Sequence, residues 1–122
     1  MIATPGKSVL APAVTHELLR WIAAARGLEV AGLLLENAAG EQRIQRAPNL
    51  AREPGEAEVP RWWLDRSLAR RDEAGFRPVA FFHSHRSSLE MSATDRESAR
   101  TMSLPWIVLA VREGELAWAV HG

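Results

Sequence analysis

The chain has 122 residues, a length that predicts one domain, residues 1–122, built around a single hydrophobic core. Its 15 basic and 15 acidic residues give a formal net charge of zero, so neither nucleic acid nor an anionic membrane is an expected partner. The sequence has no cysteine, which excludes disulfides, thiolate metal ligands and a cysteine nucleophile.

The first seven residues lack the apolar segment of a signal peptide. The longest apolar runs, residues 30–35 and 106–111, are too short to cross a bilayer. We therefore expect a cytoplasmic protein.

A helix and a strand pair are expected in the first half of the chain. Residues 8–10 are a candidate edge strand, and helical spacing of apolar residues predicts a helix that opens near Pro12 and stops at Gly27. Residues 30–35 are apolar on both faces, as central buried strands are. Residues 42–46 are expected to return beside them as a hairpin.

The second half alternates helices with strands. By composition the segment 49–60 has little regular structure, except for a candidate edge strand at its end. The elements expected there and beyond are an edge strand (57–59), helices (61–74 and 92–102) and strands (79–83, 106–111 and 116–120). This order predicts an α/β fold, a mixed sheet with helices against it.

The clearest chemical signal is the pair His83 and His85 at the end of the strand expected over 79–83. Alternation along a strand sends both imidazoles to one face and Ser84 to the other. Asp95, in the first turn of the next helix, adds a carboxylate. Two imidazoles and a carboxylate, with a fourth position left for water, are the ligand set of a catalytic zinc site.

Asp95 also has a purely structural explanation. Ser92 and Asp95 form a Ser-x-x-Asp pattern ahead of a helix, which is close to a capping box. We expect the two roles to compete, because a carboxylate turned toward a metal cannot also serve fully as a cap. Judged without the histidines, the cap is the better explanation.

A general base must accompany such a site. Glu29 opens the strand expected beside the histidine strand, so its carboxylate could lie within reach of a metal-bound water. Glu36, Glu58 and Glu90 are rival bases, and the sequence does not choose among the four.

Other polar residues receive simpler interpretations. We treat His16 and His121 as surface residues. A nucleophilic triad built on Ser84 is disfavoured, because its side chain points away from both neighbouring histidines and no nucleophile-elbow pattern surrounds it.

Taken together, these residues resemble the motif of the JAMM (MPN-plus) metalloprotease family. Its pattern is a glutamate that opens a strand, then His-x-His, a short loop and Ser-x-x-Asp. The matching positions are Glu29, His83, His85, Ser92 and Asp95. The resemblance extends over most of the chain and is to the short bacterial type.

This resemblance implies a single-domain α/β fold with a mixed, mostly antiparallel, curved sheet flanked by helices, similar to that of cytidine deaminases. It also implies that His83, His85 and Asp95 hold a catalytic zinc ion. Glu29 would be the general acid and base, and Ser92 would help to stabilise the oxyanion of the tetrahedral intermediate.

The resemblance further implies hydrolysis of the peptide or isopeptide bond after the C-terminal glycine of a ubiquitin-like or sulfur-carrier protein with a Gly-Gly tail. No insertions for gripping ubiquitin chains are present, which favours a small substrate of the bacterial type. Arg86 stands where the family usually has proline. We expect a monomer or homodimer that uses neither nucleic acid nor membrane.

Two alternatives belong to other functional classes. The first is a non-catalytic MPN-type scaffold that binds partners, although such relatives usually lack one or more metal ligands. The second is a zinc deaminase, which needs a Cys-x-x-Cys contribution or a further histidine that this chain does not offer.

Overall fold

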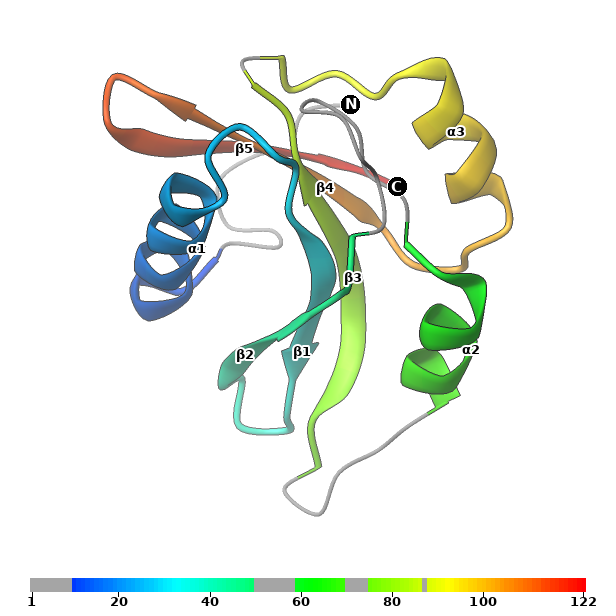
Figure 1. The fold of residues 1–122 in the computed structure, drawn as a ribbon. Coiled ribbons are helices and arrows are strands. Elements are labelled where there is room, and N and C mark those ends of the chain that lie inside the picture. Colours follow the sequence, from blue (N-terminus) through cyan, green and yellow to red (C-terminus); the bar gives the residue numbers. More distant parts are fainter. Residues whose placement is uncertain (1–9, 50–58, 70–74, 87) are drawn as a thin grey trace.

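Figure 1 shows a computed structural model of the chain, a twisted sheet with helices packed against it. The structure describes residues 10–49, 59–69, 75–86 and 88–122. In chain order the elements are α1 (Pro12–Ala24), β1 (Ala31–Glu36), β2 (Gln42–Arg46), α2 (Arg61–Ala69), β3 (Arg77–Ser84), α3 (Ala93–Arg100), β4 (Trp106–Arg112) and β5 (Glu115–His121).

The five strands are ordered β2-β1-β3-β4-β5. Strands β3 and β4 are parallel, and the other neighbouring pairs are antiparallel. A parallel pair needs a long crossover, and here the crossover contains α3. The expected mixed, mostly antiparallel sheet is therefore confirmed.

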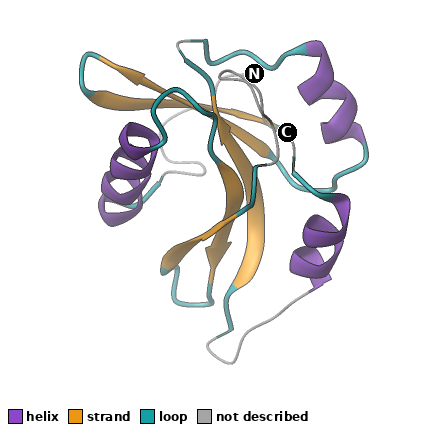
Figure 2. Cartoon of the chain, in the orientation of Figure 1, coloured by secondary structure: helices purple, strands orange, loops and turns teal. Residues whose placement is uncertain are grey.

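Apolar side chains fill both faces of this sheet. The core between α1 and the sheet contains nine buried residues: Leu10, Val14, Leu18, Val30, Leu34, Ala80, Phe82, Ile107 and Leu109. The opposite face buries Ala31, Leu33, Ala47, Phe81 and Trp106 and is covered by apolar residues of α2 and of the α3 region. Figure 2 shows α1 on one side of the strands and both other helices on the other.

Alternation along β3 decides which face receives the histidines. Phe82 points toward α1, whereas Phe81 belongs to the face under α2 and α3. The ring centroid of His83 lies 6.3 Å from that of Phe81 and 5.2 Å from that of Trp106. His83 therefore lies on the α2 and α3 face, as the period of two requires.

One expectation about β3 was wrong. The strand was expected over residues 79–83, but β3 runs from Arg77 to Ser84 and therefore includes Pro78. Pro78 pairs with Leu35 where the β1–β3 register shifts between Leu34 and Leu35. Proline has no N–H to donate, so an irregularity in the ladder is where a strand tolerates it.

Some expectations fall on residues outside the described ranges. These are residues 8 and 9 of the first candidate edge strand, residues 57 and 58 of the second, and the second helix beyond Ala69. Leu10 and Val59, which are described, are not in strands. Within the described residues, no helix is both long enough and apolar enough to cross a membrane.

Candidate metal centre

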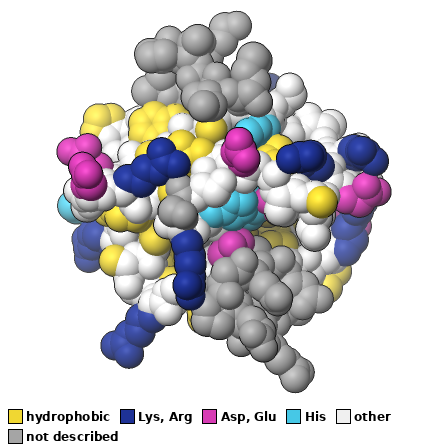
Figure 3. Space-filling model, turned by 90° about the horizontal axis from the view of Figure 1, so that it is seen from above, with side chains coloured by type: hydrophobic (Ala, Val, Ile, Leu, Met, Phe, Trp, Pro, Cys, Tyr) yellow, Lys and Arg dark blue, Asp and Glu magenta, His cyan; other side chains and the backbone are white. Residues whose placement is uncertain are grey.

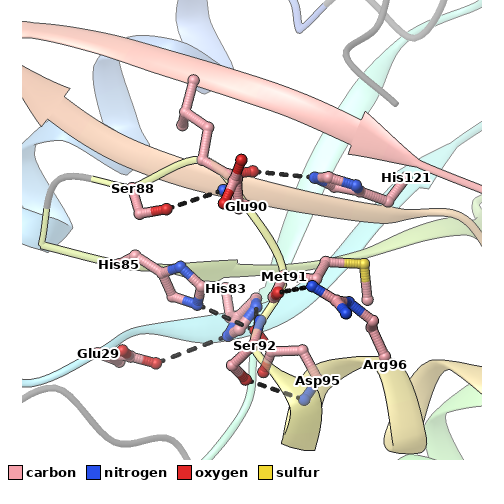
Figure 4. Close-up of polar contacts among 11 residues, drawn as sticks. Glu29, His83, His85, Ser88, Glu90, Met91, Ser92, Asp95, Arg96 and His121 are labelled. Atoms are coloured by element: carbon pink, nitrogen blue, oxygen red, sulfur yellow. Dashed lines mark hydrogen bonds and ion pairs between the residues drawn. The ribbon is translucent and has the colours of Figure 1, made fainter.

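Four chemically active side chains meet where β3 ends. His83 is the penultimate residue of β3 and His85 directly follows the strand, Glu29 precedes β1, and Asp95 lies in the first turn of α3. Asp95 Oδ2 is 3.1 Å from His85 Nε2 and 3.3 Å from His83 Nε2. Glu29 Oε1 is 3.6 Å from His83 Nδ1. Figure 4 shows both imidazoles between Glu29 on one side and Asp95 on the other.

The start of β1 is tied directly to the end of β3. Ser84 N donates a hydrogen bond to Val30 O, and Val30 N donates to Ser84 Oγ, each over 2.9 Å. On the other side of the same peptide, Asn49 Nδ2 donates to Glu29 O over 2.8 Å. The backbone of Glu29 is thus held from both sides, so its carboxylate is directed at His83. Because the Ser84 hydroxyl is committed to Val30, the geometry also disfavours a Ser84 nucleophile.

Asp95 combines the two roles that were expected to compete. Asp95 N donates to Ser92 Oγ over 3.0 Å, and Ser92 N donates to Asp95 Oδ2 over 3.0 Å, which completes a capping box for α3. The same Oδ2 atom faces both imidazoles. The cap therefore orients the carboxylate instead of diverting it, and the expected competition was wrong.

Burial and charge act in opposite directions on His83, whose exposed fraction is 2%. Burial lowers the pKa of its imidazole, but the nearby carboxylates of Asp95 and Glu29 outweigh burial, so the net pKa is raised above its ordinary value. Burial raises the pKa of Asp95, but the adjacent imidazoles of His83 and His85 lower it by more. The net pKa of Asp95 therefore lies well below its usual range. Without a cation, the two carboxylates therefore keep His83 protonated to a higher pH than an ordinary histidine.

A metal ion fits this cluster on two observations. His83 Nε2 is buried and makes no hydrogen bond, although Asp95 Oδ2 lies 3.3 Å away. In a tetrahedral site with metal–ligand bonds of about 2.0–2.2 Å, ligand atoms lie roughly 3.3–3.6 Å apart. The separations of Asp95 Oδ2 from the two Nε2 atoms are close to that spacing.

Glu29 stands in a different relation to the histidines. One nitrogen from each histidine and one oxygen of Glu29 lie within 4.8 Å of one another, a grouping that could itself hold an ion. However, Glu29 approaches His83 at Nδ1, the ring nitrogen opposite the one that faces Asp95. The described residues therefore offer a carboxylate at each ring nitrogen of His83, Glu29 at Nδ1 and Asp95 at Nε2.

The rival bases lie elsewhere or outside the described residues. Glu36 lies at the far end of β1, where its carboxylate accepts a hydrogen bond from Gln42 Nε2 over 3.1 Å. Glu90 is exposed in the loop before α3, and Glu58 is not among the described residues. Of the candidates described, Glu29 is the one whose carboxylate contacts the histidines.

Comparison with known proteins identifies the family of the chain. The model of a family described as prokaryotic homologs of the JAB domain matches residues 11–121. The chain belongs to this family. The JAMM (MPN) resemblance carried by the sequence is thereby confirmed at the level of the family.

Solved structures and curated proteins extend the comparison. The JAB domain is similar to the solution structure of protein DSY2949 from Desulfitobacterium hafniense, with a TM-score of 0.70 and 20% identity. The match covers 90% of this chain and 80% of that one. At this identity the similarity shows the fold alone. No curated protein matches the chain.

The sequence did not predict the contacts of two residues near the candidate metal centre of the JAB domain. His121 is not a surface residue: it is half-buried in β5, and its Nε2 donates to Leu89 O over 2.9 Å. This bond ties the loop before Ser92 to the sheet. The Trp106 indole is buried edge-on against the His83 ring. Alternation along β4 and β5 could have indicated burial, but not these partners. His16 is exposed, as expected.

Two hollows flank the metal centre. The hollow on the α2 and α3 side, about 170 Å³, is lined by His83, Asp95, Trp106 and apolar residues that include Leu64 and Met102. The other hollow, about 180 Å³, lies at the end of α1 and is lined by residues that include Glu29, His85 and Arg86. Figure 3, in which the molecule is seen from above, shows histidine and acidic side chains close together in the middle of the visible surface.

Proposed function

We propose that this JAB domain is a zinc-dependent peptidase. Its substrate would be the peptide or isopeptide bond after the C-terminal glycine of a ubiquitin-like or sulfur-carrier protein. The observation that carries the proposal is the approach of one Asp95 oxygen to Nε2 of both His83 and His85, with Nε2 of the buried His83 otherwise unpartnered. Membership of the JAB family supports a metallopeptidase.

In this proposal His83, His85 and Asp95 hold the ion. Zinc would supply Lewis-acid chemistry, lowering the pKa of water and polarising the substrate carbonyl. The capping box would keep the Asp95 carboxylate aimed at the imidazoles. The raised pKa of His83 means that its proton must leave before the nitrogen can ligate an ion.

Glu29 would move the proton. Its carboxylate takes a proton from the attacking water as the new C–O bond forms, and delivers it to the leaving nitrogen as the C–N bond breaks. The overall reaction adds one water across one amide. Ser92 Oγ accepts the Asp95 amide in the capping box, which leaves its hydroxyl hydrogen available for the developing oxyanion.

The glycine-ended tail would lie in the hollow between α2, α3 and the sheet. Glycines have no side chains, so an extended tail could pass close to His83 between the apolar walls formed by Leu64 and Met102. A candidate edge for β-strand pairing with the tail is residues 56–59. Of these residues only Val59 is described, and it lines this hollow.

Zinc analysis and a cleavage assay together test the proposal. The substrate is a ubiquitin-like carrier that ends in Gly-Gly and is extended by further residues. We expect stoichiometric zinc and cleavage after the second glycine. Glu29→Gln should keep zinc and lose at least about a hundredfold in kcat, the size typical of general acid–base catalysis, whereas His83→Ala should lose both.

Full activity of Glu29→Gln would contradict the role of Glu29. Zinc-free protein that binds the carrier without cleaving it would instead favour the non-catalytic scaffold. His16→Ala is the matched histidine control, because His16 is exposed on α1.

A further inference from the structure

We infer that Arg86 selects substrates in which the group released from the glycine is a single amino acid with a free α-carboxylate. This inference rests on the proposed function and names the leaving group of the same reaction. The inference distinguishes a single amino acid, as the group released, from a protein lysine and from a longer peptide tail.

The hollow at the end of α1 combines an apolar wall with charged groups. Ile22, Leu28 and Val111 line it, together with Glu29, His85 and Arg86. Leu28 is 43% exposed and is one of two large hydrophobic residues that are exposed in the described part of the chain. An exposed leucine beside a catalytic carboxylate suits contact with an apolar part of a substrate.

Arg86 is placed to bind an anion in this hollow. Its side chain is exposed, and within the described ranges no carboxylate pairs with it. By contrast, Arg61 and Arg100 each pair with a carboxylate, those of Asp65 and Glu97 respectively. A guanidinium is always charged, and it binds a carboxylate through two parallel hydrogen bonds.

The position of Glu29 assigns this hollow to the leaving group. Glu29 gives its proton to the departing nitrogen, so the residue that carries this nitrogen must lie beside Glu29. Asp95 lies on the other side of the imidazoles, toward α3 (Figure 4). The tail ending in glycine therefore occupies the α2 and α3 side, and the released residue occupies the α1 side.

The hollow beside Glu29 is small, and we place the released residue in it. Its volume of about 180 Å³ is below the roughly 300–1,000 Å³ of pockets for drug-sized ligands. One amino acid fits, with its side chain against Leu28 and its carboxylate on Arg86. A lysine joined through its ε-nitrogen, or the first residue of a longer tail, would not present a free carboxylate at this place.

Two substrates that differ in one charge test the inference. Both are the same carrier ending in Gly-Gly-Ala, one with a free C-terminal carboxylate and the other with a C-terminal amide. The zinc-loaded protein should cleave the acid with a kcat/KM about tenfold or more higher than the amide, the scale of a charge-assisted hydrogen bond.

Arg86→Gln should remove this preference, so that the ratio of kcat/KM for the acid to kcat/KM for the amide falls to about one. Arg86→Lys should restore part of the preference. Arg100→Gln, which removes an equal charge from the exposed surface of α3, should keep all of it. Zinc content should be the same in all four proteins.

The outcomes separate this inference from the proposed function. Equal cleavage of the acid and the amide by the unsubstituted protein, or a preference that survives Arg86→Gln, would overturn the role of Arg86 alone. If the zinc-loaded protein cleaved neither substrate, the proposed peptidase would fall together with its leaving group.

Discussion

At the scale of single residues, His83 is the central side chain of the candidate metal site. It is buried between two carboxylates, Asp95 at Nε2 and Glu29 at Nδ1. The carboxylates raise the pKa of His83, so in the absence of metal the protonated form is favoured to higher pH than for an ordinary histidine. In the proposed site, a bound cation would therefore replace a proton.

This exchange predicts the pH dependence of zinc binding. An imidazole ligates zinc only when neutral, so binding must release the His83 proton below its raised pKa. We expect zinc affinity to rise steadily from about pH 5.5 to about pH 8, with proton release measurable by calorimetry in two buffers of different ionisation enthalpy. Equal zinc affinity at both ends of this range would contradict the prediction.

Ser84 would act as a positioning residue for Glu29 in the proposed reaction. Its hydroxyl accepts the Val30 amide at a buried site. Ser84→Ala would leave that amide unpaired, at a cost of about 1–3 kcal/mol in the free energy of unfolding. We expect zinc content to be retained and kcat to fall, because the start of β1 carries Glu29.

Rescue by Ser84→Thr distinguishes this role from a general loss of stability. Threonine keeps the hydroxyl, so both the melting temperature and kcat should recover. A Ser84→Ala protein with unchanged kcat would show that the hydrogen bond does not position Glu29.

At the scale of elements, the approach of β1 to its neighbours depends on Gly32. A Cβ added at Gly32 would overlap the carbonyl oxygen of Gln45 on β2 and the ring of Phe82 on β3. Backbone cannot move aside as a flexible side chain can, so an added methyl group must displace β2 or Phe82.

Gly32→Ala should therefore destabilise the fold. Overpacking a close contact costs about 1–3 kcal/mol, which chemical denaturation can measure. Gly122→Ala is the matched control, because a Cβ there would make only ordinary contacts with Pro105. A Gly32→Ala protein as stable as the control would contradict the close approach.

At the scale of the whole molecule, the metal centre joins parts of the chain that are far apart in sequence. The two imidazoles come from the end of β3, the Asp95 carboxylate comes from α3, and Glu29 precedes β1. A cation held by these groups would cross-link one edge of the sheet to the crossover helix. Folding and metal binding are then linked, because the unfolded chain has no assembled site.

Removal of zinc should therefore lower the melting temperature. At a free zinc concentration about 100 times Kd the stabilisation is about 2.7 kcal/mol, which for a domain of this size corresponds to roughly 10 °C. A chelator should abolish this increment in the unsubstituted protein and change nothing in Asp95→Asn. Equal melting temperatures with and without chelator in the unsubstituted protein would contradict the linkage.

Local sequence patterns were enough to predict most of the elements and the motif. Apolar spacing predicted α1, and the period of two predicted that His83 and His85 share a face while Ser84 does not. The Ser-x-x-Asp pattern predicted the capping box that begins α3. Each of these features depends on neighbours within a few residues, so the sequence by itself determined them.

Only the tertiary structure decided which side chains meet. The pairing of Ala31 with His83 brings Glu29, rather than Glu36 or Glu90, to the imidazoles. The parallel crossover returns α3 so that one Asp95 oxygen both caps the helix and faces the histidines. Such contacts depend on strand register and on how elements pack across long separations, and no local periodicity encodes either of them.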